Sequence, residues 1–333
     1  MKHVTSGVSK KLITPKQVDS LSTMSSYLWR VLLLRHKLSF KYLYYKKYEK
    51  AILSSSPVVC DQNSEYEIHI LTCKKDALCA LWSLKTFFHY SGLKTRLIIH
   101  DDGTLTDDVI QIFLSHFSGC DIIRKRDAAI NMRQYLRDFE YCSRFRFGQK
   151  KDAKVSLKLF DFFFFSRTKR ILSIDSDILF FSKPTEIVQN MTNNKGCFTS
   201  DYQNAYSVPV AELKNKLGIK LRSQVNTGVF YFPGFECYDL NFLDSIIKMI
   251  YEYRHPISFW IEQTCFALIF SNYKDVFERL PASYQISKNP ITDETKSHHF
   301  VNDGSRTGFY TKGLAYLKNK DFLTQFNKTN FPG

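Results

Sequence analysis

The alternation of short apolar runs with longer helix-like segments constrains the fold of this chain more than any other feature of its sequence. The strand-like runs are mostly apolar, whereas in the helix-like segments apolar side chains recur every three or four positions. The predicted strands are 68–72, 96–100, 121–123 and 170–175, and the predicted helices are 76–90, 106–116 and 153–165. This order predicts an α/β fold, with a mainly parallel sheet and helices on both of its faces.

The second half of the chain is less regular than the first. One further strand is predicted over 225–232, and helices are predicted over 240–253 and 258–270. The basic segment between residues 123 and 153 is predicted to be a loop, and the tail after Ser283, which contains proline and several glycines, is predicted to be rich in loops.

Positive charge is concentrated at the N-terminus. The 333 residues include 47 Lys and Arg against 32 Asp and Glu, and residues 1–60 supply nine of the fifteen excess positive charges. We expect residues 1–62 to form a basic, largely helical extension and residues 63–325 to form the main domain, with halves at about 66–182 and 183–325. The apolar fraction of 44% and the charged fraction of 24% exclude a largely disordered or collagen-like chain.

The cysteines and the first apolar run indicate a cytoplasmic protein. The eight cysteines include no Cys-x-x-Cys pair, which argues against a zinc ribbon or a thioredoxin-type site and predicts reduced thiols in the core. The first apolar run, 28–34, is interrupted by Arg30, is too short to span a bilayer and begins too late for a signal peptide.

The basic segment 28–50 mixes bulky apolar and cationic residues, and two interpretations of it are open. In the first, it lies peripherally on an anionic membrane surface, which attracts basic residues. In the second, it is a helix that packs on the main domain and has a solvated basic face. Its charges do not gather on one helical face, as they do in a clearly interfacial helix. Nucleic acid is the less expected partner.

Two aspartates at the end of a predicted strand form the strongest candidate site. In Ile174-Asp175-Ser176-Asp177-Ile178 the two carboxylates follow an apolar run. Unpaired carboxylates are costly inside a sheet, so they must lie where the strand emerges, and open α/β sheets bind ligands at the carboxyl ends of their strands. Two oxygen ligands there suit Mg²⁺ or Mn²⁺, particularly when a diphosphate supplies further ligands.

The sequence resembles the GT-A-fold nucleotide-sugar glycosyltransferases, in particular the retaining glycosyltransferase family 8, which includes glycogenin and bacterial lipopolysaccharide glycosyltransferases. Four segments, within roughly residues 66–317, carry the resemblance in the order of the family. They are 156–160 with 170–177, 226–230, 262–263 and 299–301. The resemblance implies a mainly parallel, Rossmann-like sheet flanked by helices, and a hexosyltransferase that requires Mn²⁺ (or Mg²⁺).

The resemblance also implies roles for individual residues. Asp175, Asp177 and His299 would bind the metal. Glu262, Gln263 and Lys158 would act at the sugar and the donor phosphates as catalytic residues. The residues that would bind the nucleotide-sugar donor are Thr72, Asp101, Asp102, Lys158, Asp175, Asn226, Thr227, Gly228 and, at the diphosphate, Arg306 or Lys312.

The sequence departs from the family pattern at two places. Asn302 stands where the family has glycine, and the lysine that usually follows is absent, so that either Arg306 or Lys312 must supply the cation. Glu262 stands where the family has aspartate, which is one methylene shorter.

Each assignment also has a simpler alternative. Lys158 could be a solvated helix residue, and Asp101 and Asp102 could simply form a turn. Asn226 could hydrogen-bond backbone groups at the start of a strand, and Glu262 and Gln263 could lie on an exposed helix surface. His298 could take the role assigned to His299.

The function that the resemblance implies is a metal-dependent transfer of a hexose from a nucleotide-diphosphate sugar, expected to be a UDP-sugar, to a hydroxyl group with retention of configuration. No nucleophile stands out, so we expect front-face displacement, with Glu262 as the alternative for a covalent step. The acceptor could be a surface glycan, a lipid-linked saccharide or a protein. A two-metal nucleotidyltransferase is the rival from another class, but it leaves His299 and 226–228 unexplained. The third hypothesis is a membrane-bound interaction module with a degenerate site.

Overall fold

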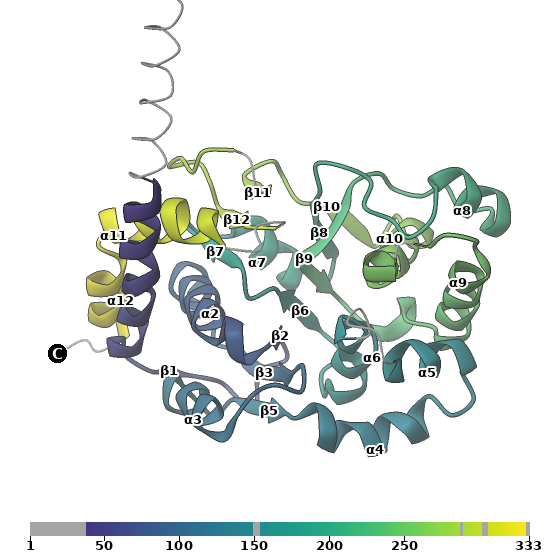
Figure 1. Ribbon diagram of the computed structural model, residues 1–333, viewed down its shortest axis with the longest axis horizontal. Helices are drawn as coiled ribbons and strands as arrows, with labels where there is room; N and C mark the ends of the chain where they lie inside the picture. Colours follow the sequence, from purple (N-terminus) through teal and green to yellow (C-terminus); the bar gives the residue numbers. More distant parts are fainter. Residues whose placement is uncertain (1–37, 149–153, 257, 287–288, 302–305, 331–333) are drawn as a thin grey trace, which may run out of the picture.

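A seven-stranded sheet lies at the centre of the protein, for which the computed structural model describes residues 38–148, 154–256, 258–286, 289–301 and 306–330 (Figure 1). β9 is antiparallel to both of its neighbours, and all other adjacent strands of this sheet are parallel. The sheet is therefore mainly parallel, as predicted. Its strands, in spatial order, are β10 (Phe277–Arg279), β8 (Gly196–Ser200), β9 (Val225–Phe232), β6 (Ile171–Ile174), β2 (Glu67–Thr72), β3 (Arg96–Asp101) and β5 (Asp121–Ile123).

Helices cover both faces of this sheet, because alternate side chains of its strands are apolar on both faces. In β9, Val229 and Tyr231 belong to one hydrophobic cluster, and Phe230 and Phe232 belong to the other. The helices that contribute to the first cluster are α2 (Ala77–Ser91), α3 (Asp107–His116), α7 (Thr185–Thr192), α11 (Ala315–Asn319) and α12 (Phe322–Asn330). Those that contribute to the second are α4 (Lys125–Tyr135), α5 (Glu140–Phe147), α6 (Ser156–Phe165), α8 (Val210–Leu217), α9 (Leu240–Glu252) and α10 (Ile261–Asn272).

Two smaller sheets and several short helices complete the fold. One small sheet has the order β11 (Tyr284–Ile286), β12 (Ser297–His299), β7 (Ile178–Phe180), and the other pairs β1 (Val58–Val59) with β4 (Phe117–Ser118). The short helices are η1 (Glu49–Ser54), η2 (Lys74–Asp76), η4 (Phe235–Cys237), η5 (Ser258–Trp260) and η6 (Phe309–Leu314). β7 follows the two aspartates directly, so the first small sheet borders the candidate site.

Two predictions of loop structure are wrong. The segment predicted as a basic loop contains α4 and α5, whose apolar sides are narrow: only Ala128 and Met132 of α4, and Cys142 and Phe145 of α5, are buried apolar residues. Such helices give a weak periodic signal. The tail after Ser283 contains β11, β12, η6, α11 and α12. The strand predicted over 225–232 is confirmed with the same bounds.

The described part of the basic N-terminal segment packs on the domain. Residues 38–48 are helical, and η1 and β1 follow, with Ile52 fully buried in the first cluster. Residues 28–37 lie outside the described residues, and the division of the chain at residue 62 stays a prediction. Within the described ranges, none of the helices combines the length and the apolar character that a membrane span requires. The eight cysteines are unpaired, and all except Cys73 are buried.

Candidate active site

Asp175 and Asp177 lie where β6 leaves the central sheet. The Asp175 backbone N–H donates to the Gly228 carbonyl at 2.8 Å, which extends the pairing of β6 with β9 by one residue. β7 then begins at Ile178. The side chains of Asp175 and Asp177 keep 27% and 23% of their surface exposed. Both carboxylates therefore reach solvent at the carboxyl end of a buried strand.

β12 brings His299 to the two aspartates. β12 pairs antiparallel with β7, with His299 opposite Ile178, and the Phe300 N–H donates to the Asp177 carbonyl at 3.1 Å. His299 Nε2 lies 3.2 Å from Asp177 Oδ1 and 3.8 Å from Asp175 Oδ2. One ligand atom from each of these three residues lies within 4.8 Å of the others, which is close enough for a shared metal ion.

The surroundings of His299 suit a metal ligand. Its Nδ1 lies 2.9 Å from Asn226 Oδ1, which also accepts from the Gly228 N–H at 3.0 Å. Because an amide oxygen only accepts, Nδ1 donates to Asn226 and Nε2 faces the carboxylates, where it can bind a metal once its own proton has left. Two carboxylates and one imidazole suit Mn²⁺, and also Mg²⁺, and leave coordination positions for a diphosphate. The donor set therefore fits a divalent cation.

Asp175, Asp177 and His299 shift one another's pKa values. Burial alone would lower the pKa of His299, but the Asp177 and Asp175 carboxylates raise it above its ordinary value. Burial alone would raise the pKa of Asp177, but His299 and, after it, Arg306 hold it below its ordinary value. Without a metal, a protonated imidazole therefore compensates the carboxylates.

His298 lies on the opposite face of β12. Successive side chains of a strand alternate between its faces, and the His298 ring stacks on Phe300 with ring centroids 4.4 Å apart. The geometry thus places His299, and not its neighbour, beside the aspartates.

Gly228 leaves the space that the His299 ring occupies. A Cβ atom at this position would lie 2.3 Å from His299 Nδ1 and 2.9 Å from Asn226 Oδ1. We expect Gly228→Ala to push the ring away from the aspartates and to weaken Mn²⁺ binding by roughly 10–100-fold, as disruption of groups that orient a ligand does. Isothermal titration calorimetry measures this affinity. In the double variant Gly228→Ala/His299→Ala the two losses of Mn²⁺ binding free energy should not add, because both substitutions remove the same ligand. Additive losses would contradict this explanation.

Lys158 forms ion pairs with Asp175 and Glu262. This α6 residue is 5% exposed, so it is not a solvated helix residue. Its Nζ lies 2.9 Å from Asp175 Oδ1 and 3.5 Å from Glu262 Oε1, and it donates to the Thr227 carbonyl at 3.0 Å. Burial alone would lower the pKa of Lys158, but Asp175 and Glu262 raise it, so the ammonium stays charged.

Glu262 and Gln263 lie in the first turn of α10 and are buried, at 5% and 8% exposure. The alternative that they are exposed helix surface is therefore wrong. Glu262 Oε2 accepts from Thr227 Oγ1 at 3.1 Å, and Gln263 Nε2 donates to the Ala205 carbonyl at 2.9 Å. Burial raises the pKa of Glu262, although Lys158 opposes the shift.

The proposed nucleotide-binding residues lie at the ends of β2 and β3. Thr72 is buried, and its Oγ1 has no hydrogen-bond partner among the described residues. Asp101 Oδ1 accepts from three backbone N–H groups of the following turn, at 2.7–2.9 Å, which supports the turn interpretation for this residue. Asp102 Oδ2 pairs with Lys154 at 2.5 Å.

The two candidate diphosphate cations lie in different places. Arg306 pairs with Asp76 at 2.6 Å, and its charge acts on Asp177. Its NH1 atom is buried and has no hydrogen-bond partner in the described part of the chain. Lys312 is exposed on η6 and lines a separate hollow with Lys41. The geometry therefore favours Arg306; Asn302 lies outside the described residues.

A cavity of about 300 Å³ is lined by nine of the predicted site residues: Lys158, Asp175, Asp177, Asn226, Thr227, Gly228, Glu262, Gln263 and His299. Thr72, Asp101, Asp102, Arg306 and Lys312 do not line it. Seven of its lining residues were not predicted to be site residues, among them Asp201, Trp260 and Val301. Asp201 directly follows β8 and its Oδ2 accepts from Asn226 Nδ2 at 3.3 Å. An aspartate directly after a strand could have been identified from the sequence as a candidate site residue, whereas nothing in the sequence marks Trp260 or Val301 as one.

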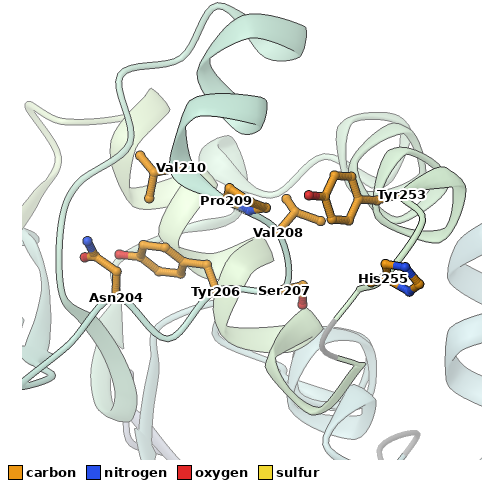
Figure 2. Close-up of a pocket in the computed structure, with 8 residues that line it drawn as sticks. All are labelled: Asn204, Tyr206, Ser207, Val208, Pro209, Val210, Tyr253 and His255. Atoms are coloured by element: carbon orange, nitrogen blue, oxygen red, sulfur yellow. The ribbon is translucent and has the colours of Figure 1, made fainter.

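A second hollow, of about 400 Å³, shares two chain segments with the walls of the first (Figure 2). Asn204 and Tyr206 of the second alternate along the chain with Gln203 and Ala205 of the first. Tyr253 and His255 of the second precede Phe259 and Trp260 of the first. Figure 2 shows Val208 and Pro209 between Tyr206 on one side and Tyr253 on the other.

Two solved structures with a similar fold are glycosyltransferases. The apo form of mouse xyloside xylosyltransferase 1 matches with a TM-score of 0.50 at 11% identity, over 73% of this chain and 98% of that chain. The bifunctional glycosyltransferase WbbM matches with a TM-score of 0.52 at 13% identity, over 80% of this chain and 52% of that chain. No protein-family model and no curated protein sequence matches the chain. The chain has the GT-A type of glycosyltransferase fold, as predicted.

Proposed function

We propose that this protein is a metal-dependent glycosyltransferase that moves a hexose from a nucleotide-diphosphate sugar, expected to be a UDP-sugar, to a hydroxyl acceptor. The observation that carries the proposal is the convergence of Asp175, Asp177 and His299 at the end of β6 in a glycosyltransferase fold. The metal would be Mn²⁺ or Mg²⁺. When bound, it would act as a Lewis acid that stabilises the charge developing on the leaving diphosphate.

The protein side chains would orient the metal ligands and bind the diphosphate and the sugar. The ammonium of Lys158 orients Asp175 through Oδ1, so that Oδ2 faces His299 and the proposed metal position. Arg306 would add positive charge at the diphosphate, to which its NH1 atom, unpartnered among the described residues, could donate. Gln263 and Asn226 line the cavity beside the sugar position.

Retention by front-face displacement is the expected stereochemical course. Both carboxylate oxygens of Glu262 face protein groups, Lys158 and Thr227, which favours a role in holding the site over a covalent role. The acceptor hydroxyl would then be deprotonated by the leaving diphosphate on the same face of the sugar.

The acceptor is proposed to be a glycan or a lipid-linked saccharide, with a protein as the alternative. The hollow of Figure 2 gives a longer saccharide room next to the cavity, with Tyr253 and His255 on its wall. A lipid-linked saccharide would be presented at a membrane, and the basic N-terminal segment would hold a peripheral enzyme there.

Binding of UDP tests the proposal without knowledge of the sugar. Isothermal titration calorimetry should show that UDP binds when Mn²⁺ is present and binds much more weakly with EDTA. A panel of UDP-sugars should then yield free UDP only with the metal. Turnover of nucleoside triphosphates in place of UDP-sugars would instead support the nucleotidyltransferase, and an absence of Mn²⁺-dependent binding of UDP and of GDP would overturn the proposal.

A further inference from the structure

The helix of residues 38–48 exposes large apolar side chains to solvent. Tyr42, Tyr45 and Tyr48 pack against the first hydrophobic cluster. On the other side, Phe40 and Leu43, three residues apart, are 72% and 62% exposed. Among the described residues, half of the exposed large apolar side chains lie within 38–53. A soluble surface rarely concentrates such residues without a partner.

Residues 38–50, which comprise this helix and the start of η1, present only positive charge to solvent. Lys41, Lys46, Lys47 and Lys50 are exposed. Glu49, the single acidic residue of 38–50, is 6% exposed and is turned into the domain, where Tyr310 donates to it at 3.1 Å. The outward surface of this segment is therefore apolar and cationic, although its sequence alone did not separate the charges onto one face.

A hollow beside the helix brings a second cation next to Lys41. It has a volume of about 420 Å³ and is lined by Lys41 of the helix and by Lys312 of η6. Ile291 and Tyr316 supply apolar wall. The nearby carboxylate of Asp293 is paired with Lys320 at 2.8 Å and accepts from Tyr316 at 2.7 Å, so it does not pair with either lysine. Two lysines at one hollow suit a phosphate group.

We propose that this surface docks the protein onto an anionic lipid bilayer, with Phe40 and Leu43 inserted among the acyl chains and with Lys41 and Lys312 bound to lipid phosphates. Exposed aromatic and aliphatic residues next to lysines are what interfacial helices present to acidic membranes. A protein partner would also cover the apolar residues, but it would not need phosphate-binding lysines at the edge. The docking does not depend on the proposed chemistry.

Co-sedimentation with vesicles tests the docking. The full-length protein should bind vesicles of phosphatidylcholine and phosphatidylglycerol at 7:3 and should bind pure phosphatidylcholine at least tenfold more weakly. Phe40→Ser/Leu43→Ser should reduce the partition onto the acidic vesicles at least tenfold, and Lys41→Glu/Lys312→Glu should reduce it about tenfold and lower its sensitivity to salt.

Matched variants distinguish docking through this surface from nonspecific adsorption to vesicles. Ile130, on α4, is 77% exposed, so Ile130→Ser removes an equally exposed apolar side chain elsewhere. Lys214 and Lys216 lie on α8, at the opposite end of the molecule in Figure 1. Lys214→Glu/Lys216→Glu therefore changes the net charge by the same amount as Lys41→Glu/Lys312→Glu, but far from the proposed docking surface. Both controls should leave vesicle binding within twofold of the natural protein. Unchanged binding of Phe40→Ser/Leu43→Ser, or equal losses in the controls, would overturn the proposal. Mn²⁺-dependent UDP binding should be normal in Phe40→Ser/Leu43→Ser and in both controls.

Discussion

Asp177→Asn should lower kcat/KM for release of UDP from UDP-sugars by about a thousandfold. The substitution keeps the size of the side chain but removes one of the two negative charges that would bind the metal. It also leaves His299 without the carboxylate that lies 3.2 Å from its Nε2. Loss of a Lewis acid costs several kcal/mol of transition-state stabilisation, and about 4 kcal/mol corresponds to a factor of about a thousand.

Binding and stability measurements distinguish this effect from misfolding. Mn²⁺ affinity, from calorimetry, should fall with activity, whereas the midpoint of thermal unfolding should change little, because Asp177 is at a strand end and 23% exposed. Asp107→Asn is the matched control: this carboxylate is 83% exposed at the start of α3, and its replacement should leave both measurements unchanged. Full Mn²⁺ affinity in Asp177→Asn would show that the metal does not bind here.

The central sheet could be predicted because its strands are buried on both faces. Such strands are short, nearly continuous apolar runs between turn residues, and β9 was predicted with its observed bounds. The helices α4 and α5 could not be predicted by the same criterion. α5 contacts α9 through a backbone N–H of Cys142 that donates to Asp244 at 2.8 Å, a contact between residues 102 positions apart. Tertiary contacts of this kind leave no local pattern in the sequence.

The candidate site was predictable to the extent that its residues are unusual for their local structure. Two carboxylates after an apolar strand are such a case, and the structure brings His299 to them. The hydrogen bond that orients His299 could not be predicted, because Asn226 is 73 residues away and on another sheet. Nor could the sequence decide between Arg306 and Lys312, since the choice depends on which of them faces Asp177.

Loss of Arg146 should destabilise the fold more than loss of any surface ion pair. Arg146 of α5 forms two hydrogen bonds with Asp161 of α6, at 2.6 and 2.7 Å, and both side chains are 1% exposed. Arg146→Met would leave the Asp161 carboxylate buried without its partner, which typically costs about 3–5 kcal/mol. Burial already raises the pKa of Asp161 with Arg146 in place, so the unpaired carboxyl should take up a proton.

Urea unfolding of two further variants decides whether the unpaired charge is the cause. Arg146→Met/Asp161→Leu removes both charges from the α5–α6 contact and should lose less stability than Arg146→Met alone, because no buried carboxylate remains. Arg137→Met breaks the pair of Arg137 with Asp138, whose side chains are 70% and 74% exposed, and should change the free energy of unfolding by less than about 0.5 kcal/mol. If the double variant were as unstable as Arg146→Met, the lost packing of the long arginine side chain would explain the effect, and the charge would not. Since α6 also carries Lys158, a local shift of this helix in Arg146→Met should weaken Mn²⁺ binding as well, whereas Arg137→Met should not.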